Sequence, residues 1–270
     1  MRTLSGIFGF LGYGNMGSAI ASGLLEQQAL KPAQLHTYDP APERMTEAKA
    51  LGIRCADTPQ TLLDACDTLV LAVKPQMLNA SLAPITDTAR PDLRVISIMA
   101  GISIATLKTR FGANARIIRV MPNTPALVGA GAAAIACCDA CAETDVADAR
   151  AIFEAVGIAE IVPESQMDAV TALSGSGPAY FFYLAECLVA AATAQGLPED
   201  TALRLAGQTL LGAGQLLVSS KERPDVLREQ VTSKGGVTFA ALEAMRAADF
   251  TAMIQTAYQA AVKRSSELGT

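Results

Sequence analysis

The chain has 270 residues, of which 51% are hydrophobic, and a formal net charge of −5 at pH 7. A chain of this length usually buries more than one hydrophobic core, so two domains are expected. The acidic balance, with no basic stripe, excludes nucleic acid and anionic membranes from the expected partners.

The first predicted strand, residues 5–11, runs into a glycine-rich turn and then a helix over 16–28. Gly12 permits a tight turn, Gly14 lets the backbone approach phosphate groups, and Gly17 lets the helix and strand pack closely. The helix N-terminus offers free N–H groups and a positive dipole to an anion. The order strand, turn, helix predicts a dinucleotide-binding loop made of Gly12, Tyr13, Gly14, Asn15, Met16 and Gly17.

The same stretch carries no charge from Thr3 to Leu25, so a signal peptide and a membrane helix are alternatives. Its six glycines are too many for a good apolar helix. The apolar run before Gly12 is also too short for a membrane span. We therefore favour the dinucleotide loop.

Strands and helices continue to alternate up to residue 163. Further strands are predicted at 34–38, 68–73, 94–99, 116–120, 132–136 and 159–162. Helices are predicted at 42–51, 76–88, 103–111 and 143–156. The run 69–73 is apolar at every position, which is typical of a central strand buried on both faces. This order predicts a doubly wound, Rossmann-like α/β domain with a mostly parallel sheet over residues 1–163.

After residue 163 the pattern is helical throughout. Helices are predicted at 167–173, 178–195, 198–219, 224–231, 238–247 and 250–266. Pro178, Pro198 and Pro224 stand where a first-turn proline is tolerated, and Gly196 stands where a helix ends. The sequence therefore predicts an all-helical second domain over residues 164–270.

Ligands of a doubly wound sheet bind at the carboxyl ends of its strands. Residues after three predicted strands, besides the glycine loop, qualify as coenzyme contacts: Asp39, Ala72, Val73, Lys74, Pro75, Ala100 and Gly101. Asp39 lies where an acidic residue binds the ribose 2′-hydroxyl of NAD, which favours NADH. Arg44 could instead hold a 2′-phosphate, which favours NADPH. Lys74 either pairs with phosphate or ribose or is a solvated lysine at a strand end.

Three further motifs stand out in the remaining sequence. Residues 120–125, VMPNTP, read as a strand followed by a loop fixed by two prolines. Residues 172–180, ALSGSGPAY, read as a helix broken by small residues before a second helix starts, and 231–238, VTSKGGVT, read as another break before a helix. Both breaks expose N–H groups at helix N-termini beside hydroxyl groups, which suits a small carboxylate. Simple helix caps are the alternative, because Ser, Thr and Gly favour caps.

Together, the motifs GYGNMGSA, AVKP, VMPNTP, LSGSGPAY and VTSKGGVT resemble those of the pyrroline-5-carboxylate reductase family, in the family's order and spacing over essentially the whole chain. The resemblance implies a cytoplasmic enzyme of proline biosynthesis that uses NADPH, with NADH possible. It also implies that the helical domain forms a homodimer by interleaving with a partner subunit. Dimers of this family often assemble into a decamer.

The resemblance also implies roles for single residues. Ser233, Gly236 and Val237 would hold the substrate carboxylate, and the Thr238 hydroxyl would face the ring nitrogen. The loops 12–17, 72–75 and 100–101 would contact the dinucleotide. Residues expected to line the nicotinamide and substrate cleft are Asn123, Ser174, Gly175, Ser176 and Gly177.

The chain departs from its relatives at three positions of interest. Most relatives have Pro at Lys234 and Thr or Ala at Val237, and many have Ser, Thr or Asn at or near Asp39. Lys234 either adds positive charge near the substrate carboxylate or points to solvent. Asp39 puts the family's preference for NADPH in doubt.

Two other functions are weighed against the reductase. A β-hydroxyacid dehydrogenase needs a basic residue after its glycine-rich interdomain motif, but residues 178–188 contain no Lys, His or Arg. A non-enzymatic NAD(P)-binding paralogue is disfavoured because Asn123, Ser176, Ser233 and Thr238 are present together.

Six cysteines are irregularly spaced, at 55, 66, 137, 138, 141 and 187. We expect reduced thiols in a cytosolic chain. Cys138 and Cys141 form a Cys-x-x-Cys pair without a second such pair, and His36 is the only histidine. The sequence therefore predicts no metal site.

Overall fold

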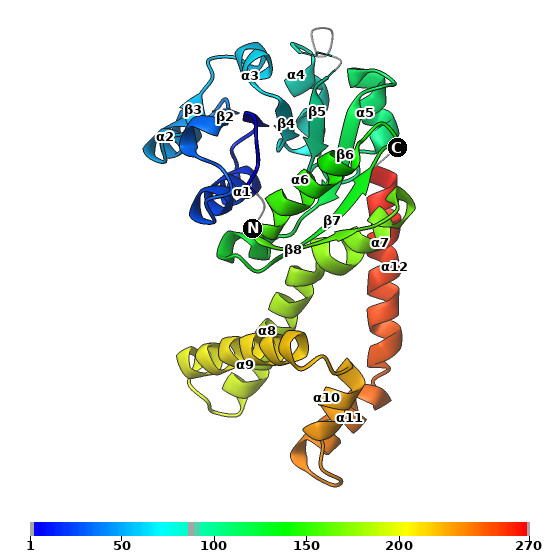
Figure 1. The fold of residues 1–270 in the computed structure, drawn as a ribbon. Helices are drawn as coiled ribbons and strands as arrows, with labels where there is room; N and C mark the ends of the chain where they lie inside the picture. Colours follow the sequence, from blue (N-terminus) through cyan, green and yellow to red (C-terminus); the bar gives the residue numbers. More distant parts are fainter. Residues whose placement is uncertain (1–2, 86–89, 91, 269–270) are drawn as a thin grey trace. The chain divides into compact units, whose positions relative to one another are not determined.

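The computed structural model describes residues 3–85, 90 and 92–268 (Figure 1). The chain divides into two compact units. Met1–Ser176 and Ala261–Thr270 form the first, and Gly177–Ala260 form the second. The first unit contains the sheet, and the second contains only helices among the residues described.

A single eight-stranded sheet organises the first unit, in the order β3-β2-β1-β4-β5-β6-β7-β8. Its strands are β1 (Phe8–Leu11), β2 (Leu35–Tyr38), β3 (Arg54–Cys55), β4 (Thr68–Leu71), β5 (Arg94–Ser97), β6 (Arg116–Met121), β7 (Gly131–Cys137) and β8 (Gly157–Ile161). Neighbouring strands are parallel except β6 and β7, which run antiparallel. β1 lies between β2 and β4, so its residue Phe8 is opposite both Leu35 and Thr68.

Helices cover both faces of this sheet, as the uniformly apolar strands predict. They are α1 (Asn15–Glu26), α2 (Pro42–Ala50), α3 (Pro59–Ala65), α4 (Leu78–Leu82), α5 (Ile104–Phe111), α6 (Glu143–Glu154) and α7 (Met167–Val170). Phe8 and Phe10 belong to a buried cluster with residues of α1, α2 and α6. Leu69 and Leu71 belong to another with residues of α3, α4, α5 and α7. The predicted doubly wound sheet is confirmed.

Two short elements were not predicted, and one predicted helix is interrupted. These are the strand β3 and the helix α3, which lie in a stretch without a long apolar pattern. The helix predicted over 76–88 begins instead as a 3₁₀ turn, Pro75–Met77, followed by the single helical stretch α4. Residues 86–88 of that prediction lie outside the described residues.

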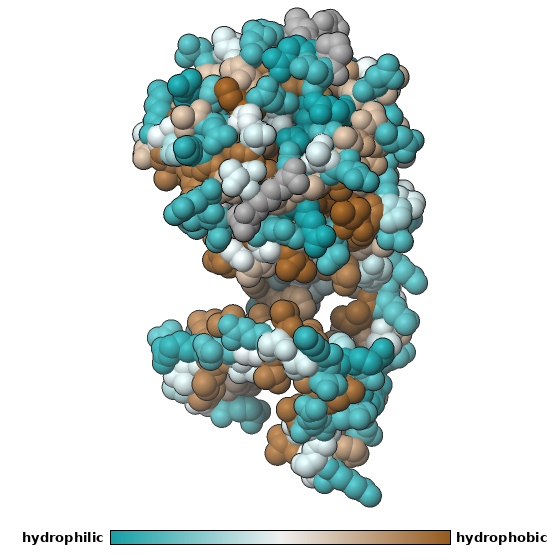
Figure 2. All heavy atoms as spheres, viewed as in Figure 1, coloured by the Kyte–Doolittle hydropathy of each residue, from teal (hydrophilic) through white to brown (hydrophobic). Residues whose placement is uncertain are grey.

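The second unit consists of α8 (Gly177–Ala194), α9 (Glu199–Ser220), α10 (Pro224–Gln230), α11 (Val237–Ala247) and the first part of α12 (Phe250–Leu268). Helices α8 and α9 pack against each other. Phe181, Phe182 and Tyr183 on α8 are 57%, 65% and 67% exposed, and hydrophobic residues reach the surface of this unit in Figure 2. Helices this apolar are normally covered, so the unit carries an interaction surface.

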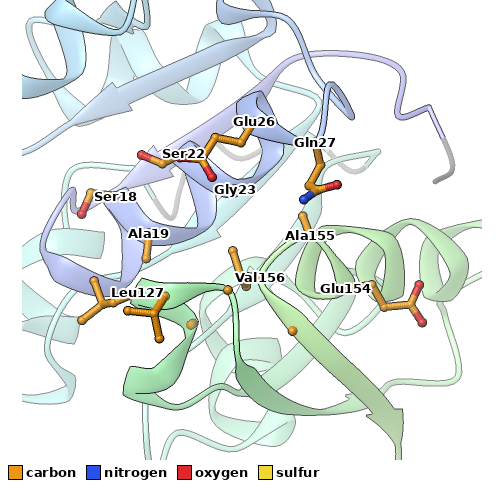
Figure 3. A pocket seen from close by; sticks show the side chains of 14 residues that line it. Ser18, Ala19, Ser22, Gly23, Glu26, Gln27, Leu127, Glu154, Ala155 and Val156 are labelled. Atoms are coloured by element: carbon orange, nitrogen blue, oxygen red, sulfur yellow. The ribbon is translucent and has the colours of Figure 1, made fainter. Parts of the chain in front are cut away.

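A groove of about 670 Å³ lies on the first unit, between α1, the 3₁₀ turn Thr124–Val128 and the junction of α6 with β8 (Figure 3). Its lining mixes polar side chains of α1, such as Ser18 and Ser22, with Leu127 and Val128. The groove contains none of the residues that the sequence assigns to coenzyme or substrate.

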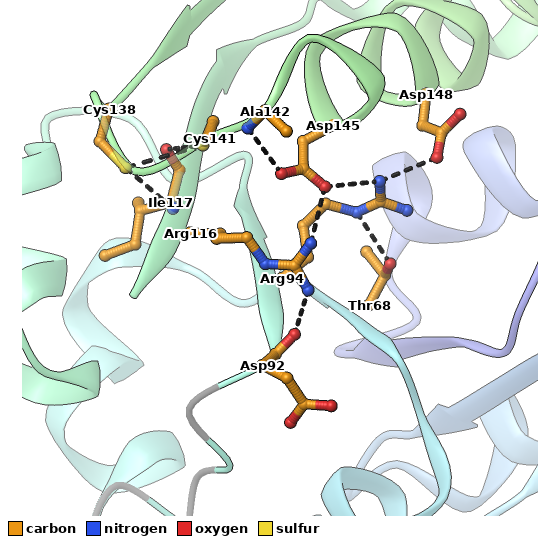
Figure 4. Close-up of polar contacts among 10 residues, drawn as sticks. All are labelled: Thr68, Asp92, Arg94, Arg116, Ile117, Cys138, Cys141, Ala142, Asp145 and Asp148. Atoms are coloured by element: carbon orange, nitrogen blue, oxygen red, sulfur yellow. Dashed lines mark hydrogen bonds and ion pairs between the residues drawn. The ribbon is translucent and has the colours of Figure 1, made fainter. Parts of the chain in front are cut away.

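A network of buried ion pairs and hydrogen bonds links α6 to the amino ends of β4, β5 and β6 (Figure 4). Arg94 Nη1 lies 3.2 Å from Asp145 Oδ1 and 2.9 Å from Asp148 Oδ2, and its Nε donates to Thr68 Oγ1. Arg116 Nη1 also donates to Asp145 Oδ1, at 2.9 Å. The side chains of Arg94 and Asp145 are 8% and 3% exposed. The network lies at the sheet edge opposite the strands' carboxyl ends.

The two cysteines that follow β7, Cys138 and Cys141, act as packed thiols. Cys138 Sγ lies 3.6 Å from Cys141 Sγ and donates to the Ala115 carbonyl, and Cys141 Sγ donates to the Ile117 carbonyl. Cysteines throughout the described residues are free thiols, and those residues contain no His, Cys, Asp or Glu cluster suited to a metal ion. Burial raises the pKa of the Cys66 thiol to about 12.

Candidate active site

The glycine loop has the geometry of a phosphate cradle. Gly12 adopts φ +97°, and a Cβ placed on it would lie 2.7 Å from the Ala72 carbonyl oxygen. A Cβ on Gly17 would lie 2.7 Å from the Gly12 oxygen, whereas one on Gly14 would meet nothing within 4 Å. Gly12 and Gly17 therefore permit close packing beneath the loop. Gly14 faces open space, where a ligand can approach the backbone.

Helix α1 presents unpaired donors to that space. Its N-cap is Gly14, which has no side chain to cap the helix. The first intrahelical bond runs from Ser18 N to Gly14 O at 2.9 Å, so the N–H groups of Asn15, Met16 and Gly17 precede it. Free N–H groups and the helix dipole favour an anion at this point. The residues present therefore fit the pyrophosphate of a dinucleotide.

Asp39 holds the glycine loop to the end of β2. Its Oδ2 accepts a hydrogen bond from Tyr13 N at 2.7 Å, and its Oδ1 accepts one from Ala41 N at 2.9 Å. Both carboxylate oxygens therefore already serve the backbone. This role was not predicted, because an Asx-type contact to a loop 26 residues earlier leaves no local pattern in the sequence.

The side chain of Tyr13 points away from the open side of the loop. Its ring is 1% exposed within the core cluster beside α1, and its hydroxyl has no hydrogen-bond partner within the described residues. Burial first, then the negative charges of Glu47 and Cys55, raises the pKa of the phenol to about 12. Tyr13 thus anchors the loop from below, and only its backbone is available to a coenzyme.

Arg44 brings a cation to the start of α1. Its Nη2 donates to Asn15 Oδ1 at 3.1 Å, and its Nη1 pairs with Glu47 Oε2 at 2.9 Å. The guanidinium-bearing side chain remains 32% exposed, so it can still meet a ligand. Arg44 and Asp39 therefore flank the same loop. Asp39 binds backbone N–H groups, whereas Arg44 binds exposed side chains and stays partly accessible.

The other predicted coenzyme residues lie at the same sheet edge. β1, β4 and β5 are adjacent and parallel, so the loops after them meet at their carboxyl ends. The loop after β4 contains Ala72, Val73, Lys74 and Pro75, and the loop after β5 contains Ala100 and Gly101. Lys74 is exposed, whereas Gly101 is buried with φ +77°.

Asn123 is fully occupied as a structural link. Its Oδ1 accepts a hydrogen bond from Ala132 N at 2.8 Å, and its Nδ2 donates to the Ser174 carbonyl at 3.0 Å. The residue is 9% exposed. It therefore connects the end of β6 to the start of β7 and to the loop that the sequence assigns to the substrate cleft.

The predicted interruption between two helices within 172–180 is confirmed, because α7 ends at Val170 and α8 begins at Gly177. The connection is a π-helical turn, Thr171–Gly175, in which Ser176 N donates to Thr171 O at 2.8 Å. The Ser176 N–H is therefore not free for a carboxylate. The small residues permit the widened turn, and Gly175 packs against Met121, where a Cβ would meet the methyl carbon at 2.5 Å.

The predicted break before α11 is confirmed in the second unit. Gly235 adopts φ +73°, and Gly236 N donates to Ser233 O at 2.9 Å, which closes a turn. Gly236 is the N-cap of α11, and its missing Cβ leaves room for Ser233 Oγ. The first intrahelical bond runs from Ala240 N to Gly236 O, so the N–H groups of Val237, Thr238 and Phe239 precede it.

This turn is open to solvent in the chain described. Val237 is 90% exposed, and Ser233, Lys234 and Thr238 are exposed as well. The helix dipole, three free N–H groups and two hydroxyl groups combine the donors that a small carboxylate needs.

The fold and its two donor sites define an oxidoreductase that depends on a nicotinamide dinucleotide. A family model described as "NADP oxidoreductase coenzyme F420-dependent" matches residues 7–101, and one described as "Pyrroline-5-carboxylate reductase dimerisation" matches residues 164–268. The chain belongs to the pyrroline-5-carboxylate reductase family, whose members reduce a C=N bond with NAD(P)H.

Relatives and solved structures support this placement over nearly the full length. The chain is 39% identical to pyrroline-5-carboxylate reductase of Pseudomonas aeruginosa (96% of this chain, 95% of the relative) and 40% identical to that of Synechocystis (97% of each). Its structure is similar to the Coxiella burnetii enzyme (TM-score 0.92, 31% identity, 99% and 100% covered). It is also similar to the Plasmodium falciparum enzyme with NADP bound (TM-score 0.86, 30% identity, 99% and 100% covered).

Proposed function

We propose that the chain reduces 1-pyrroline-5-carboxylate to L-proline, with NADPH as its preferred coenzyme. The observation that carries the proposal is the presence, on one chain, of two separate helix N-termini with free donors. One follows the glycine loop at Gly14, and the other follows the Ser233–Gly236 turn. A dinucleotide needs the first, and a small carboxylate substrate needs the second.

The coenzyme is held by residues of the first unit. The N–H groups of Asn15, Met16 and Gly17 bind the pyrophosphate, while the loops 72–75 and 100–101 complete the edge at which it binds. When bound, the reduced nicotinamide supplies the hydride.

The substrate carboxylate is held by residues of the second unit. The N–H groups of Val237 and Thr238 and the Ser233 hydroxyl donate to it. Gly236 contributes space rather than a donor, because its N–H already bonds to Ser233 O.

The Thr238 hydroxyl contacts the ring nitrogen of the substrate. An imine accepts hydride far better when it is protonated, and this substrate can arrive as the iminium, so no strong general acid is required. The Thr238 hydroxyl orients the nitrogen and relays its proton. Catalysis is then mainly positioning and exclusion of water, and positioning can contribute about 7–11 kcal/mol.

Asn123 and the residues 174–177 support this site as positioning residues. The hydrogen bonds of Asn123 to Ala132 N and the Ser174 carbonyl fix the segment that precedes α8. The Asn123 side chain thus helps to position its own loop and the segment 174–177, both of which are predicted to line the cleft.

The preference for NADPH follows from the different engagement of two residues. Both oxygens of Asp39 accept backbone N–H groups, which offset its charge and tie it to the loop. Arg44 is accessible at the start of α1, where its guanidinium can pair with a 2′-phosphate. The structure of an NADP-bound relative supports the same coenzyme.

We expect Arg44→Ala to lower kcat/KM for NADPH about tenfold or more. The reason is the loss of one charge-assisted contact, which contributes about 1.5–3 kcal/mol. The value for NADH should change little, because NADH has no 2′-phosphate. Initial rates at 340 nm with each coenzyme give the ratio. Glu47→Gln, which removes only the surface partner of Arg44, is the control. An unchanged ratio in Arg44→Ala would assign the preference elsewhere.

The helical residues 164–270 form the dimerisation domain in this proposal. Among the described residues, one helix, 164–194, is long and apolar enough to cross a membrane, and only 11% of its most apolar window is buried in the chain. The match to a dimerisation family supports a second copy, rather than lipid, as the cover of this surface. We propose a cytoplasmic homodimer that can assemble further into a decamer, with neither membrane nor nucleic acid as a partner.

The decisive experiment follows absorbance at 340 nm. The purified protein is mixed with racemic 1-pyrroline-5-carboxylate and either NADPH or NADH. We expect oxidation of the coenzyme with stoichiometric formation of proline. No oxidation with either coenzyme would refute the reductase function and favour a binding protein without catalytic activity.

A further inference from the structure

The last turns of α12 return to the first unit. Residues from Ala261 onward belong to that unit. Ser265 is 4% exposed, and its Oγ donates to Asp168 Oδ1 on α7 at 2.7 Å, a contact between residues 97 positions apart. A buried hydroxyl–carboxylate bond fixes the end of α12 against α7.

The end of α12 touches the loop after β5. A Cβ on Gly101 would lie 3.0 Å from the carbonyl carbon and Cβ of Leu268, and 3.1 Å from its oxygen. Gly101 is buried and has φ +77°, so a larger residue would meet both strain and crowding. The end of α12 therefore leaves no room for a side chain at Gly101.

The same loop is held at its other end by the segment after β8. Glu164 Oε1 accepts a hydrogen bond from Ile104 N, the first residue of α5, at 2.7 Å, and pairs with Arg119 Nη1 at 3.3 Å. Leu268 therefore contacts the loop after β5 at Gly101, and Glu164 binds the chain where this loop enters α5 at Ile104. Both contacts come from the part of the chain that the dimerisation family model matches.

We infer that the last turn of α12, Ser265–Leu268, is a positioning element of the coenzyme site. It seats Gly101 so that the loop after β5 is already formed when the dinucleotide arrives. A loop that is already formed loses less conformational entropy when the coenzyme binds. Removing the last turn of α12 should therefore weaken coenzyme affinity and leave the rate of hydride transfer unchanged. This inference rests on the proposed role of Ala100 and Gly101 in binding the dinucleotide.

The first test removes the contact to Gly101. A chain that ends at Ser266 loses Leu268 but keeps the bond between Ser265 and Asp168. We expect the Kd for NADPH, measured by fluorescence titration, and the KM for NADPH to rise about tenfold, which corresponds to about 1.4 kcal/mol. The kcat and the KM for the pyrroline substrate should stay near wild type. A merely structural role would lower thermal stability and leave the KM for NADPH unchanged.

Arg264→Ala is the matched control. The truncation also removes Glu267, whose exposed ion pair with Arg264 Nη1 spans 3.0 Å. Arg264→Ala breaks that pair on the same turn and leaves Leu268 in place. We expect wild-type coenzyme affinity, and a rise equal to that of the truncated chain would assign the effect to the ion pair instead.

A second variant tests the anchor of the helix end. Ser265→Ala removes the hydroxyl that bonds to Asp168, so we expect the KM for NADPH to rise in the same direction, by about threefold. Ser265→Thr keeps a hydroxyl and should restore the affinity. If neither the truncation nor Ser265→Ala changes the affinity, the inference is wrong.

Hydrogen–deuterium exchange separates this inference from the proposed function. Amides of residues 98–103 are followed in the coenzyme-free enzyme, where faster exchange in the truncated chain supports the contact and unchanged exchange overturns it. If the wild-type enzyme fails to bind NADPH, the proposed function falls, yet the exchange result still decides whether α12 holds the loop.

Discussion

Thr238→Ala is expected to lower kcat by about 100-fold or more, within the range that positioned proton transfer contributes. The hydroxyl is the only group that the alanine lacks at this position for contact with the ring nitrogen. The N–H of residue 238, which we propose as a donor to the substrate carboxylate, is retained. The KM for the pyrroline substrate should therefore change much less than kcat.

Steady-state rates at 340 nm, with both substrates varied, check this expectation. Thr238 is exposed at the start of α11, and no side-chain hydrogen bond of the fold depends on it in the contacts described, so the thermal stability should be close to wild type. Thr238→Ser keeps a hydroxyl and should recover most of the activity. Wild-type turnover in Thr238→Ala would remove this residue from the mechanism.

Asp145→Ala is expected to cost about 3–5 kcal/mol of unfolding free energy, the loss that follows when one partner of a buried ion pair is removed. The substitution leaves Arg94, whose side chain is 8% exposed, and Arg116 without a shared carboxylate oxygen. It also removes the acceptor for Ala142 N at the start of α6. Urea titration of the free energy of unfolding, at fixed protein concentration, measures the effect.

Glu154→Gln supplies the comparison on the same helix. Its partner Arg150 is paired at 2.7 Å, but the two side chains are 51% and 41% exposed, so water already screens the pair. We expect a change of no more than about 0.5 kcal/mol. Equal losses in the two variants would show that burial does not set the strength of the Asp145 network.

The sheet except β3, its flanking helices except α3, and the position of the glycine loop were predictable from the sequence. Their signals are local: apolar runs such as residues 69–73, and the glycines at 12, 14 and 17 next to a helix start. The helical second part was predictable for the same reason. The missed β3, Arg54–Cys55, has two residues and is defined by its pairing with β2, so no periodicity marks it.

The start of helix α3 carries a helix-start signal in the sequence. Thr58 accepts a hydrogen bond from Thr61 N, and Pro59 occupies the first turn, a recognisable helix start. The helix has only seven residues, too few to show an apolar face over two turns. Short helices of this kind are decided by tertiary packing, here of Leu62 and Leu63 in the core.

Within the candidate site, the fold adds contacts that no local motif indicates. The sequence predicts that Asp39 contacts the ribose, and the structure shows in addition that its two oxygens accept N–H groups of Tyr13 and Ala41. The side-chain amide of Asn123 likewise forms hydrogen bonds with Ala132 N and the Ser174 carbonyl. Such contacts join residues that are distant along the chain, and only the fold brings them together. The same is true of the bond between Ser265 and Asp168.

The central place of β1 has a consequence for synthesis on the ribosome. β1 is synthesised before β2 and β4, and its neighbour β4 begins only at Thr68. Until then, Phe8, Phe10 and Leu11, all buried in the finished sheet, belong to a strand with one open edge. Open apolar edges invite pairing with other chains. A nascent chain that stalls before β4 is therefore expected to expose an apolar strand edge.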